Sequence, residues 1–338
     1  MNVQKKLMDS TVYGSWRMSV APMMDWTDRH CRYFHRLLSR HALLYTEMVT
    51  TGALMHGDVP RHLDFNVQEH PVALQLGGSD AGELAHCATL GEQWGYGEIN
   101  LNCGCPSERV QRGSFGACLM AEPQLVADCV KAMVDAVSVP VTVKHRIGID
   151  QTESYEFVRD FVGTVSEAGC SVFLVHARNA WLKGLSPKEN REVPPLRYAM
   201  VHRLKRDFPQ LTFATNGGIT SSGQVVQELE QVDGVMIGRE AYHNPWWLAQ
   251  WDSEFFGEPL REPELTREWV EELMTEYMAR EMKDHGTPWS SIARHMLGLR
   301  NGLPGARRWR QVWSDHKLKE SHPRDVMALA HDAVARVA

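Results

Sequence analysis

Two cysteines, Cys103 and Cys105, lie in a short segment that ends in glycine and proline. Ile99 and Leu101 precede them, and such an apolar segment is typical of a buried strand that leads into a loop. A strand end is a rigid position for a reactive thiol, and Pro106 restricts the backbone directly after Cys105. Cys105 is therefore the first candidate for a catalytic group. The alternative is that it is an ordinary small buried residue, as most free cysteines are.

Polar residues and glycines stand at the ends of other apolar segments of the chain. They are Pro22 and Met23 with Ala21 before them, Gln75, Asn102, Lys144, His176, Asn216, Gly217, Gly218, Gly238 and Arg239. Glycine lets backbone N–H groups approach an anion closely, and Arg239 adds a permanent charge. The glycines that follow the last two segments, Gly217 with Gly218 and Gly238 with Arg239 after it, therefore predict a phosphate site.

The remaining side chains indicate what kind of phosphate compound would bind. Lys144 suits negative charge that develops on a ring nitrogen or oxygen, and the amides of Gln75 and the asparagines can pair with the edge of a planar heterocycle. A phosphorylated, flat, reducible cofactor fits this set, and flavin mononucleotide (FMN) fits it better than a free nicotinamide does. Pyridoxal phosphate is the closest alternative, because Lys144 could then form its Schiff base.

Eight apolar segments, each followed by a helical pattern, must position these residues. We expect strands at 18–21, 42–46, 71–76, 99–101, 139–144, 171–176, 211–216 and 234–237. Eight such units in about 250 residues predict an α/β fold, the (β/α)8 TIM barrel, whose strand ends meet at one mouth. Several strands are apolar without alternation, as strands buried on both faces are. A doubly wound sheet is the competing fold, but the chain lacks its usual glycine-rich nucleotide motifs.

The pattern changes after Pro263. Apolar residues such as Trp269 and Tyr277 recur at helical spacing, and no further strand pattern follows. We therefore expect a catalytic barrel over residues 1–258 and a small all-helical C-terminal domain over residues 259–338.

The composition is that of an ordinary globular protein, since 43% of the 338 residues are hydrophobic and 23% are charged. No apolar run reaches the roughly 20 residues that a membrane helix needs, and the N-terminus has no signal-peptide core. Seven cysteines without a disulfide framework indicate reduced thiols and a cytoplasmic protein. The net charge of −6 argues against a wholly basic nucleic-acid binder, but not against a local basic face. We predict no obligate protein partner.

Several motifs resemble those of the tRNA-dihydrouridine synthases. They are residues 21–27 (APMMDWT), 102–106 (NCGCP), 109–111 (RVQ) and 115–120 (FGACLM). Two further segments, 295–299 (HMLGL) and 304–307 (PGAR), are similar to the A-type bacterial branch of that family. The resemblance extends over nearly the whole chain.

This resemblance implies an FMN-bound barrel that uses NADPH to reduce the C5–C6 bond of uridines in the tRNA D-loop, at positions 20 and 20a for the A-type branch. It implies that flavin transfers hydride to C6 of a flipped-out uridine and that Cys105 protonates C5. It places Asn102 on the uracil or the ribose and the flavin contacts on other residues at the segment ends. The flavin contacts are Ala21, Pro22, Met23, Gln75, Lys144, His176, Asn216, Gly217, Gly218, Gly238 and Arg239.

Cys103 departs from the family, which usually has an apolar residue without a thiol at this position. The departure creates a Cys-x-Cys pair and leaves open which of the two sulfurs an inhibitor would trap. A two-cysteine metal site is the alternative interpretation, but no further Cys/His pair at zinc spacing accompanies it. We therefore predict no metal.

A basic segment, residues 286–324, carries eight Lys and Arg residues against two acids. This charge suits contacts with phosphates, and a solvated helix face is the alternative. The resemblance places tRNA contacts at Arg307 and Arg310 in this segment, and at Arg191 in a long loop after the sixth strand. Two other classes of protein stay open, a flavin barrel that acts on a free pyrimidine and a non-catalytic RNA-binding protein.

Overall fold

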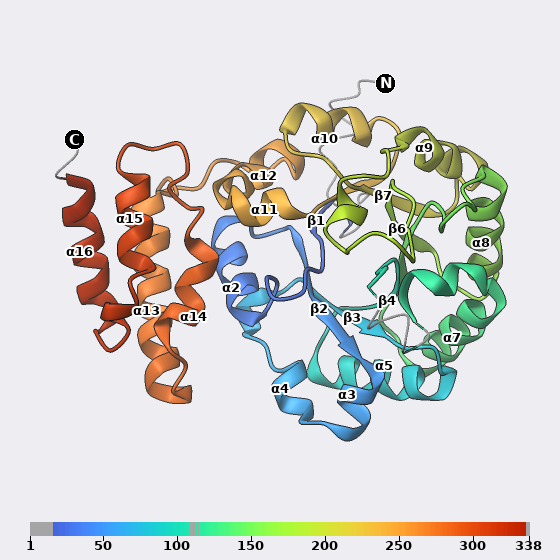
Figure 1. Cartoon of the computed structure of the whole chain (residues 1–338), viewed down its shortest axis with the longest axis horizontal. Helices are drawn as coiled ribbons and strands as arrows, with labels where there is room; N and C mark the ends of the chain where they lie inside the picture. The colour runs from blue at the N-terminus through green and yellow to red at the C-terminus, as the bar shows by residue number, and fades with distance from the viewer. Residues whose placement is uncertain (1–15, 108–112, 114, 336–338) are drawn as a thin grey trace. The chain divides into compact units, whose positions relative to one another are not determined.

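The computed structural model describes residues 16–107, 113 and 115–335, so the motif at 109–111 lies outside the described residues. It contains a closed barrel in which eight strands follow one another in chain order (Figure 1). The strands are β1 (Met18–Val20), β2 (Leu43–Thr50), β3 (Val72–Gly77), β4 (Glu98–Cys103), β5 (Val141–Arg146), β6 (Val172–His176), β7 (Thr212–Asn216) and β8 (Gly234–Ile237). All neighbouring pairs are parallel, including β8 with β1. The predicted (β/α)8 TIM barrel is confirmed.

Helices follow the strands along the chain. They are α2 (Arg29–Leu38), α3 (Thr51–His56), α4 (Val59–Leu63), α5 (Ala81–Trp94), α7 (Pro123–Ala136), α8 (Tyr155–Glu167), α9 (Tyr198–Asp207), α10 (Ser222–Leu229), α11 (Arg239–His243), α12 (Leu248–Phe255), α13 (Arg267–His285), α14 (Trp289–Ala293), α15 (Ala306–Trp313) and α16 (Pro323–Ala335). Among the residues that the structure describes, no helix is long and apolar enough to cross a membrane.

The side chains on the two faces of the barrel strands belong to different clusters. Outward side chains such as Ile99, Leu101 and Cys103 belong to the large apolar cluster that also includes residues of helices α5, α7 and α8. A smaller cluster in the barrel interior contains Ala21, Leu43, Tyr45, Ala73, Leu174, Ala214 and Met236. Strands β4 and β5 do not follow the expected pattern of continuous apolar residues, because they alternate apolar residues with polar ones. Their polar residues, such as Asn100 and Thr142, are buried as completely as the apolar ones.

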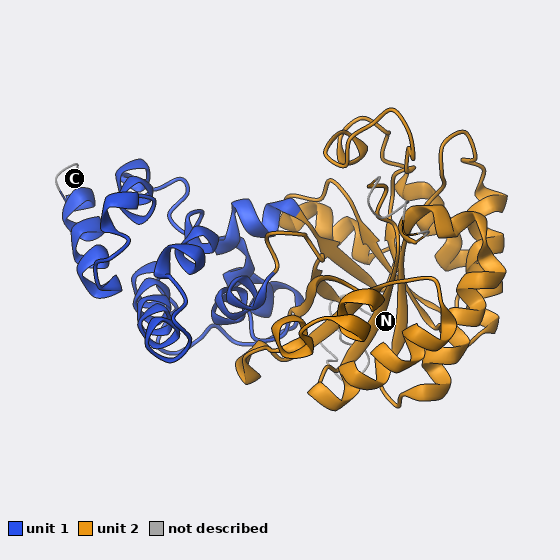
Figure 2. Ribbon diagram, turned by 60° about the horizontal axis from the view of Figure 1, so that its bottom comes forward, with its two compact units in different colours: residues 1–9, 28–41, 239–338 blue, residues 10–27, 42–238 orange. Residues whose placement is uncertain are grey.

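The chain forms two compact units (Figure 2). Of the described residues, one unit contains 16–27 and 42–238, and with them all eight strands. The other contains 28–41 and 239–335, so it combines α2 with α11 to α16. The functional division into residues 1–258 and 259–338 stays a prediction.

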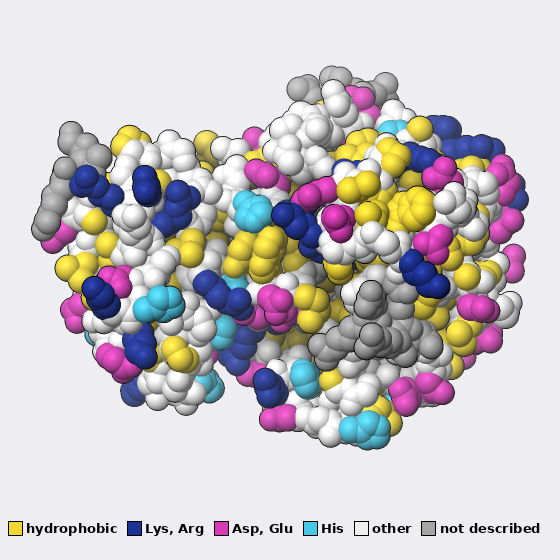
Figure 3. Space-filling view, viewed as in Figure 1, with side chains coloured by type: hydrophobic (Ala, Val, Ile, Leu, Met, Phe, Trp, Pro, Cys, Tyr) yellow, Lys and Arg dark blue, Asp and Glu magenta, His cyan; other side chains and the backbone are white. Residues whose placement is uncertain are grey.

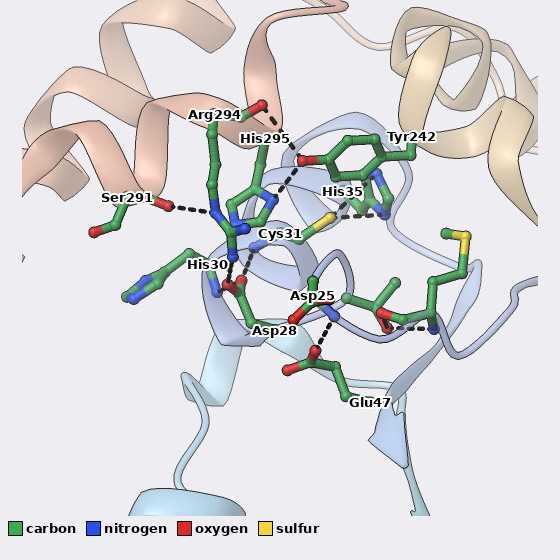
Figure 4. A network of polar contacts seen from close by, with 12 residues as sticks. Asp25, Asp28, His30, Cys31, His35, Glu47, Tyr242, Ser291, Arg294 and His295 are labelled. Carbon is green, nitrogen blue, oxygen red and sulfur yellow. Dashed lines mark hydrogen bonds and ion pairs between the residues drawn. The ribbon is translucent and has the colours of Figure 1, made fainter. Parts of the chain in front are cut away.

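Helix α2 joins the helical unit through its N-terminus. Asp28 caps the helix by accepting hydrogen bonds from two backbone N–H groups of the first turn. The same carboxylate lies 2.7 Å from Arg294 Nη2 and 3.0 Å from His295 Nε2, and the Tyr242 hydroxyl lies 3.2 Å from the other ring nitrogen of His295 (Figure 4). Burial alone would raise the pKa of Asp28, but the hydrogen bond and charge of His295 hold this pKa well below its usual value. One carboxylate thus links α2 to the segment after α14.

A buried carboxylate also organises the C-terminal helices. Glu271 on α13 is inaccessible to solvent and accepts hydrogen bonds from the indole N–H groups of Trp309 at 2.6 Å and Trp313 at 2.9 Å. Arg300 Nη2 lies 3.2 Å from its second oxygen, and His331 Nε2 lies 3.1 Å from the same oxygen. A buried charge is tolerated only when it is paired and hydrogen-bonded. Glu271 therefore fixes the positions of α15 and α16 against α13.

Replacement of Glu271 by Gln should lower the free energy of unfolding of the helical unit by about 3 kcal/mol, because the buried guanidinium of Arg300 would keep only the exposed carboxylate of Glu268 as its ionic partner. Urea denaturation followed by tryptophan fluorescence would measure this, since two of the partners are tryptophans. The matched control is Glu276→Gln on the same helix, where the ion pair with Arg324 is exposed. That change should cost less than about 1 kcal/mol. Equal losses from the two variants would contradict the role given to Glu271.

Candidate functional site

The register of the strands brings several of the predicted site residues to one end of the barrel. Asn102 on β4 pairs with Lys144 on β5, and His176 on β6 pairs with both Arg146 on β5 and Asn216 on β7. Lys144 Nζ lies 3.3 Å from Asn216 Oδ1 and so spans the interior between β5 and β7. These residues all stand at the carboxyl ends of their strands, where TIM barrels carry their active sites.

The loop after β4 holds Cys105 at this end by its backbone. Asn102 Oδ1 accepts hydrogen bonds from the backbone N–H groups of Gly104 at 3.1 Å and Cys105 at 3.0 Å. Arg146 Nε donates to the carbonyl of Gly104 at 3.0 Å, and the N–H of Ala117 donates to the carbonyl of Cys105 at 2.9 Å. The thiol of Cys105 is half-buried. Four hydrogen bonds therefore fix the backbone of this loop around a partly exposed cysteine.

The second cysteine of the pair has a different environment. Cys103 is fully buried and belongs to the cluster outside the strands. Burial, with the neighbouring thiols of Cys129, Cys170 and Cys118, raises the pKa of Cys103 well above its usual value. Cys103 therefore acts as a core residue in place of the apolar one. Within the described part of the chain, no three His, Cys, Asp or Glu side chains are grouped so that they could hold a metal ion.

The amide of Gln75 is engaged on both sides. Gln75 is 1% exposed, its Oε1 accepts from Asn102 Nδ2 at 2.9 Å, and its Nε2 donates to Asn100 Oδ1 at 2.7 Å. The sequence predicted that Gln75 pairs with a heterocycle, and the structure places it next to Asn102, below the loop of Cys105. Each of its strong hydrogen-bonding atoms already has a partner within the protein.

Positive charge accumulates at the mouth. Burial and the charge of Arg146 together lower the pKa of Lys144 to about 7, against the opposing effect of Cys105. Burial also holds the pKa of His176 well below its usual value, together with the charges of Arg146, Lys144, Arg178 and Arg191. Cations that suppress one another's protonation produce a positive potential that favours a bound anion. This positive potential would stabilise a bound phosphate or an anionic ring.

Arg146 is a site residue that our sequence analysis missed. It is 3% exposed, and burial lowers its pKa to about 10. Besides its bond to Gly104, Arg146 Nη1 donates to the carbonyls of Asn179 and Asn190, both at 2.9 Å. One guanidinium thus joins the Cys105 loop to the long loop after β6. Its position two residues beyond Lys144, on the same face of β5, was the signal that could have found it.

Two of the three predicted glycines, which follow β7, have a left-handed backbone conformation that favours glycine. Gly217 and Gly218 have positive φ angles of 118° and 72°. A Cβ atom on Gly217 would lie 2.6 Å from His176 Cδ2, whereas a Cβ on Gly238 would meet no atom within 4 Å. Gly217 therefore has to be glycine, and Gly238 borders open space. Arg239 is the first residue of α11, directly after Gly238.

The other predicted cofactor residues follow β1. Ala21 is buried, and its N–H donates to the carbonyl of Ile237 at 2.8 Å, which ties this segment to β8. Pro22 and Met23 are half-buried, and the N–H of Met23 donates to Thr27 Oγ1 at 2.9 Å. The segment after β1 is thus held in place next to the end of β8.

The three arginines predicted to contact tRNA lie in two different units. Arg191 is exposed in the loop after β6, and its charge lowers the pKa of both His176 and Arg146, so it lies near the mouth. Arg307 is exposed on α15, in the helical unit. Arg310 is half-buried on the same helix and donates to Asn301 Oδ1.

Comparison with known proteins identifies the chain's relatives. A family model described as "Dihydrouridine synthase (Dus)" matches residues 19–335. A tRNA-dihydrouridine(20/20a) synthase of Escherichia coli strain K12 is 59% identical over 321 residues, which cover 95% of this chain and 91% of that protein. The protein of the same name from Vibrio cholerae is 56% identical over 324 residues, covering 96% of this chain and 97% of that one.

A solved structure also resembles the chain. The complex of 2-naphthoyl-CoA reductase with 2-naphthoyl-CoA matches with a TM-score of 0.55 and 11% sequence identity. The match covers 69% of this chain and 49% of that one, so this chain accounts for about half of the reductase. At this identity the match shows a common fold alone.

The depressed pKa of Lys144 predicts a pH-dependent stability. Folded Lys144 loses its proton near pH 7, whereas the unfolded side chain keeps it to about pH 10.4. Because the unfolded state binds more protons in this window, the stability of the wild type relative to Lys144→Met should rise from pH 7 toward pH 10. Below pH 7 the difference between the two proteins should be constant. Urea denaturation of both proteins across this range would measure it, and a difference that does not change with pH would contradict the lowered pKa.

Proposed function

The chain belongs to the dihydrouridine synthase family, and on this premise we propose that it reduces the C5–C6 double bond of uridine in tRNA to give dihydrouridine. The names of its relatives support positions 20 and 20a as the targets. The observation that carries the proposal is the half-buried thiol of Cys105, held by Asn102 and Arg146 at the mouth of the barrel.

The residues at the mouth fit FMN. Arg146 supplies positive potential, to which Lys144 adds when it is protonated, and the neutral ring of His176 offers a hydrogen-bonding group. Gly238 borders open space that an anion could enter. Arg239 would add a charged donor for the phosphate. When bound, FMN would supply the hydride that C6 of uracil receives, with NADPH as the source of electrons.

Cys105 would act as the general acid. A uridine has to leave the base stack before its C5 and C6 can be reached, so the mouth must admit a single extruded base. Donation of the thiol proton to C5 completes the reduction, because hydride at C6 leaves negative charge that C5 shares. The bonds from Asn102 and Arg146 to the loop keep the sulfur in one place during this step. Asn102 would also contact the uracil or the ribose.

Binding of tRNA would use the basic residues of both units. Figure 3 shows Lys and Arg side chains over the surface of the C-terminal helices. Arg307 and Arg308 are exposed on α15, whose Ala306, Trp309 and Trp313 face the core. Arg191 near the mouth would hold the phosphates beside the extruded uridine. Contacts of this kind depend on charge and weaken as salt increases.

Replacement of Cys105 by Ala should slow the reduction of tRNA by at least about 100-fold, the usual loss when a general acid is removed. Flavin should stay bound and should still be reduced by NADPH. Mass spectrometry of dihydrouridine in the tRNA product gives the rate, and flavin absorbance gives the occupancy. Cys103→Ala is the matched control and should keep activity, because that thiol lies in the outer core. A fully active Cys105→Ala variant, or turnover on free uracil but not on tRNA, would refute the proposal.

Reversal of charge on α15 should weaken tRNA binding without affecting the flavin. With Arg307 and Arg310 replaced by Glu, the slope of log Kd against log salt should fall by about 2, while NADPH-driven flavin reduction stays unchanged. The control replaces Lys131 and Arg206, which are exposed on α7 and α9, by Glu and so has the same net charge. An equal effect of the two double variants would show that overall charge, and not this helix, governs binding.

A further inference from the structure

We propose that Asn100, Thr142 and Glu98, three buried residues below the mouth of the barrel, position the thiol of Cys105 through a directed chain of hydrogen bonds. They are positioning residues, because none is placed to touch substrate or cofactor. The inference rests on the proposed function for its kinetic consequence, but the series of hydrogen bonds is a property of the folded barrel.

The upper part of the chain begins at the loop. The backbone N–H groups of Gly104 and Cys105 donate to Asn102 Oδ1, and Asn102 Nδ2 donates in turn to Gln75 Oε1. Gln75 Nε2 then donates to Asn100 Oδ1 at 2.7 Å. Each side-chain amide accepts from the residue above and donates to the residue below. The order of these donors and acceptors is therefore the same at every step.

The lower part continues in the same sense. Asn100 Nδ2 donates to Thr142 Oγ1 at 2.8 Å, and the hydroxyl of Thr142 donates to Glu98 Oε1. Tyr45 donates its hydroxyl to the same oxygen at 2.8 Å, and Trp16 Nε1 donates to Glu98 Oε2 at 2.7 Å. Glu98 is 3% exposed and receives three donated hydrogen bonds. Burial raises the pKa of Glu98, whereas the three donated hydrogen bonds favour its ionised form. In that form both oxygens act only as acceptors and fix the direction of the hydrogen bonds.

Reversal of one amide would reverse the others. If Asn102 turned its NH2 group toward the loop, two backbone N–H groups would face a donor instead of an acceptor. Gln75 prevents this, because it presents Oε1 to Asn102 as long as its NH2 group is held by Asn100. Asn100 in turn is held by Thr142. Hydrogen bonds that run in one direction also polarise and strengthen one another.

The opposite wall of the barrel shows that this polar chain is not a general property of the interior. Leu174, Ala214 and Met236 occupy inward positions on β6, β7 and β8, as apolar residues do in most TIM barrels. Buried polar groups cost free energy unless every one is satisfied. The hydrogen-bonded side chains between Asn102 and Glu98 lie on β3, β4 and β5, and β4 leads directly to the loop of Cys105.

The test removes one hydroxyl at a distance from the mouth. Thr142→Val keeps the shape of the side chain but removes the link between Asn100 and Glu98, whereas Thr142→Ser keeps the hydroxyl. With the chain broken, the half-buried thiol of Cys105 should react with iodoacetamide about 3- to 10-fold faster, the scale of one lost hydrogen bond. Thr142→Ser should react at the wild-type rate. Peptide mass mapping assigns the label to Cys105.

A kinetic readout separates positioning from a loss of stability. In single-turnover experiments Thr142→Val should slow the oxidation of reduced flavin by tRNA about 3- to 10-fold, while flavin reduction by NADPH stays unchanged. Asn100→Leu should slow this step to a similar degree. The double variant Asn100→Leu/Thr142→Val should be no slower than Asn100→Leu alone, because both changes interrupt the same series of hydrogen bonds.

The control variant Ser19→Ala removes a buried hydroxyl on β1 that has no hydrogen-bond partner among the described residues, and it should change neither rate. If Thr142→Val labels Cys105 at the same rate as Thr142→Ser, or if the two changes add fully in the double variant, the chain does not position the thiol. If the wild type fails to reduce tRNA, the proposed function is wrong, but the labelling rates still decide the inference.

Discussion

A strand places successive side chains on opposite faces. In a closed barrel, every second side chain therefore packs against the surrounding helices, and the side chains between them face the barrel interior. Strand β4 does this by strict alternation. Ile99 and Leu101 pack on the helix side, whereas Glu98, Asn100 and Asn102 face inward. A shift of the register by one residue would bury the acid among the helices and leave the loop without its acceptor. The position of the loop that carries Cys105 depends on this alternation.

The mouth combines this geometry with an unusual balance of charge. Lys144 and His176 both have depressed pKa values, because they share a buried region with Arg146. Arg146 keeps its place through three backbone carbonyls, one of which belongs to the residue before Cys105. The same guanidinium therefore contributes positive potential and fixes two loops. An anion bound at the mouth would raise these pKa values and stabilise the protonated forms.

The sequence was sufficient for the barrel and for the ends of β6, β7 and β8, because Gly and polar residues follow these apolar segments directly. The second and fifth strands extend beyond their predicted ends at 46 and 144, to Thr50 and Arg146. Lys144, His176 and Asn216 were selected as polar residues at predicted segment ends, and the structure places them at one end of the barrel. Arg146 and Asn100 were missed, because a search for apolar segments does not register a polar residue within a strand or beyond its first polar end. The alternation of residues 98–103 was the available signal.

Other features could not be obtained from local sequence at all. Glu271 looks like any other acid on a helix, and its two indole partners lie about 40 residues further along the chain, a separation that no helical pattern encodes. The grouping of α2 with the C-terminal helices depends likewise on contacts between distant segments, such as the stacking of Tyr33 on Tyr277. Tertiary partners of this kind appear only when the fold is known.

The helical unit is discontinuous along the chain, because α2 lies between β1 and β2 while its Asp28 binds Arg294 and His295. A gene fragment that encodes only the C-terminal helices would therefore lack an integral part of their core. Recombination between relatives could not exchange this unit as a self-contained cassette. Descendants of such a protein would have to inherit the first helix of the barrel and the C-terminal helices together, and the two segments should have diverged in concert.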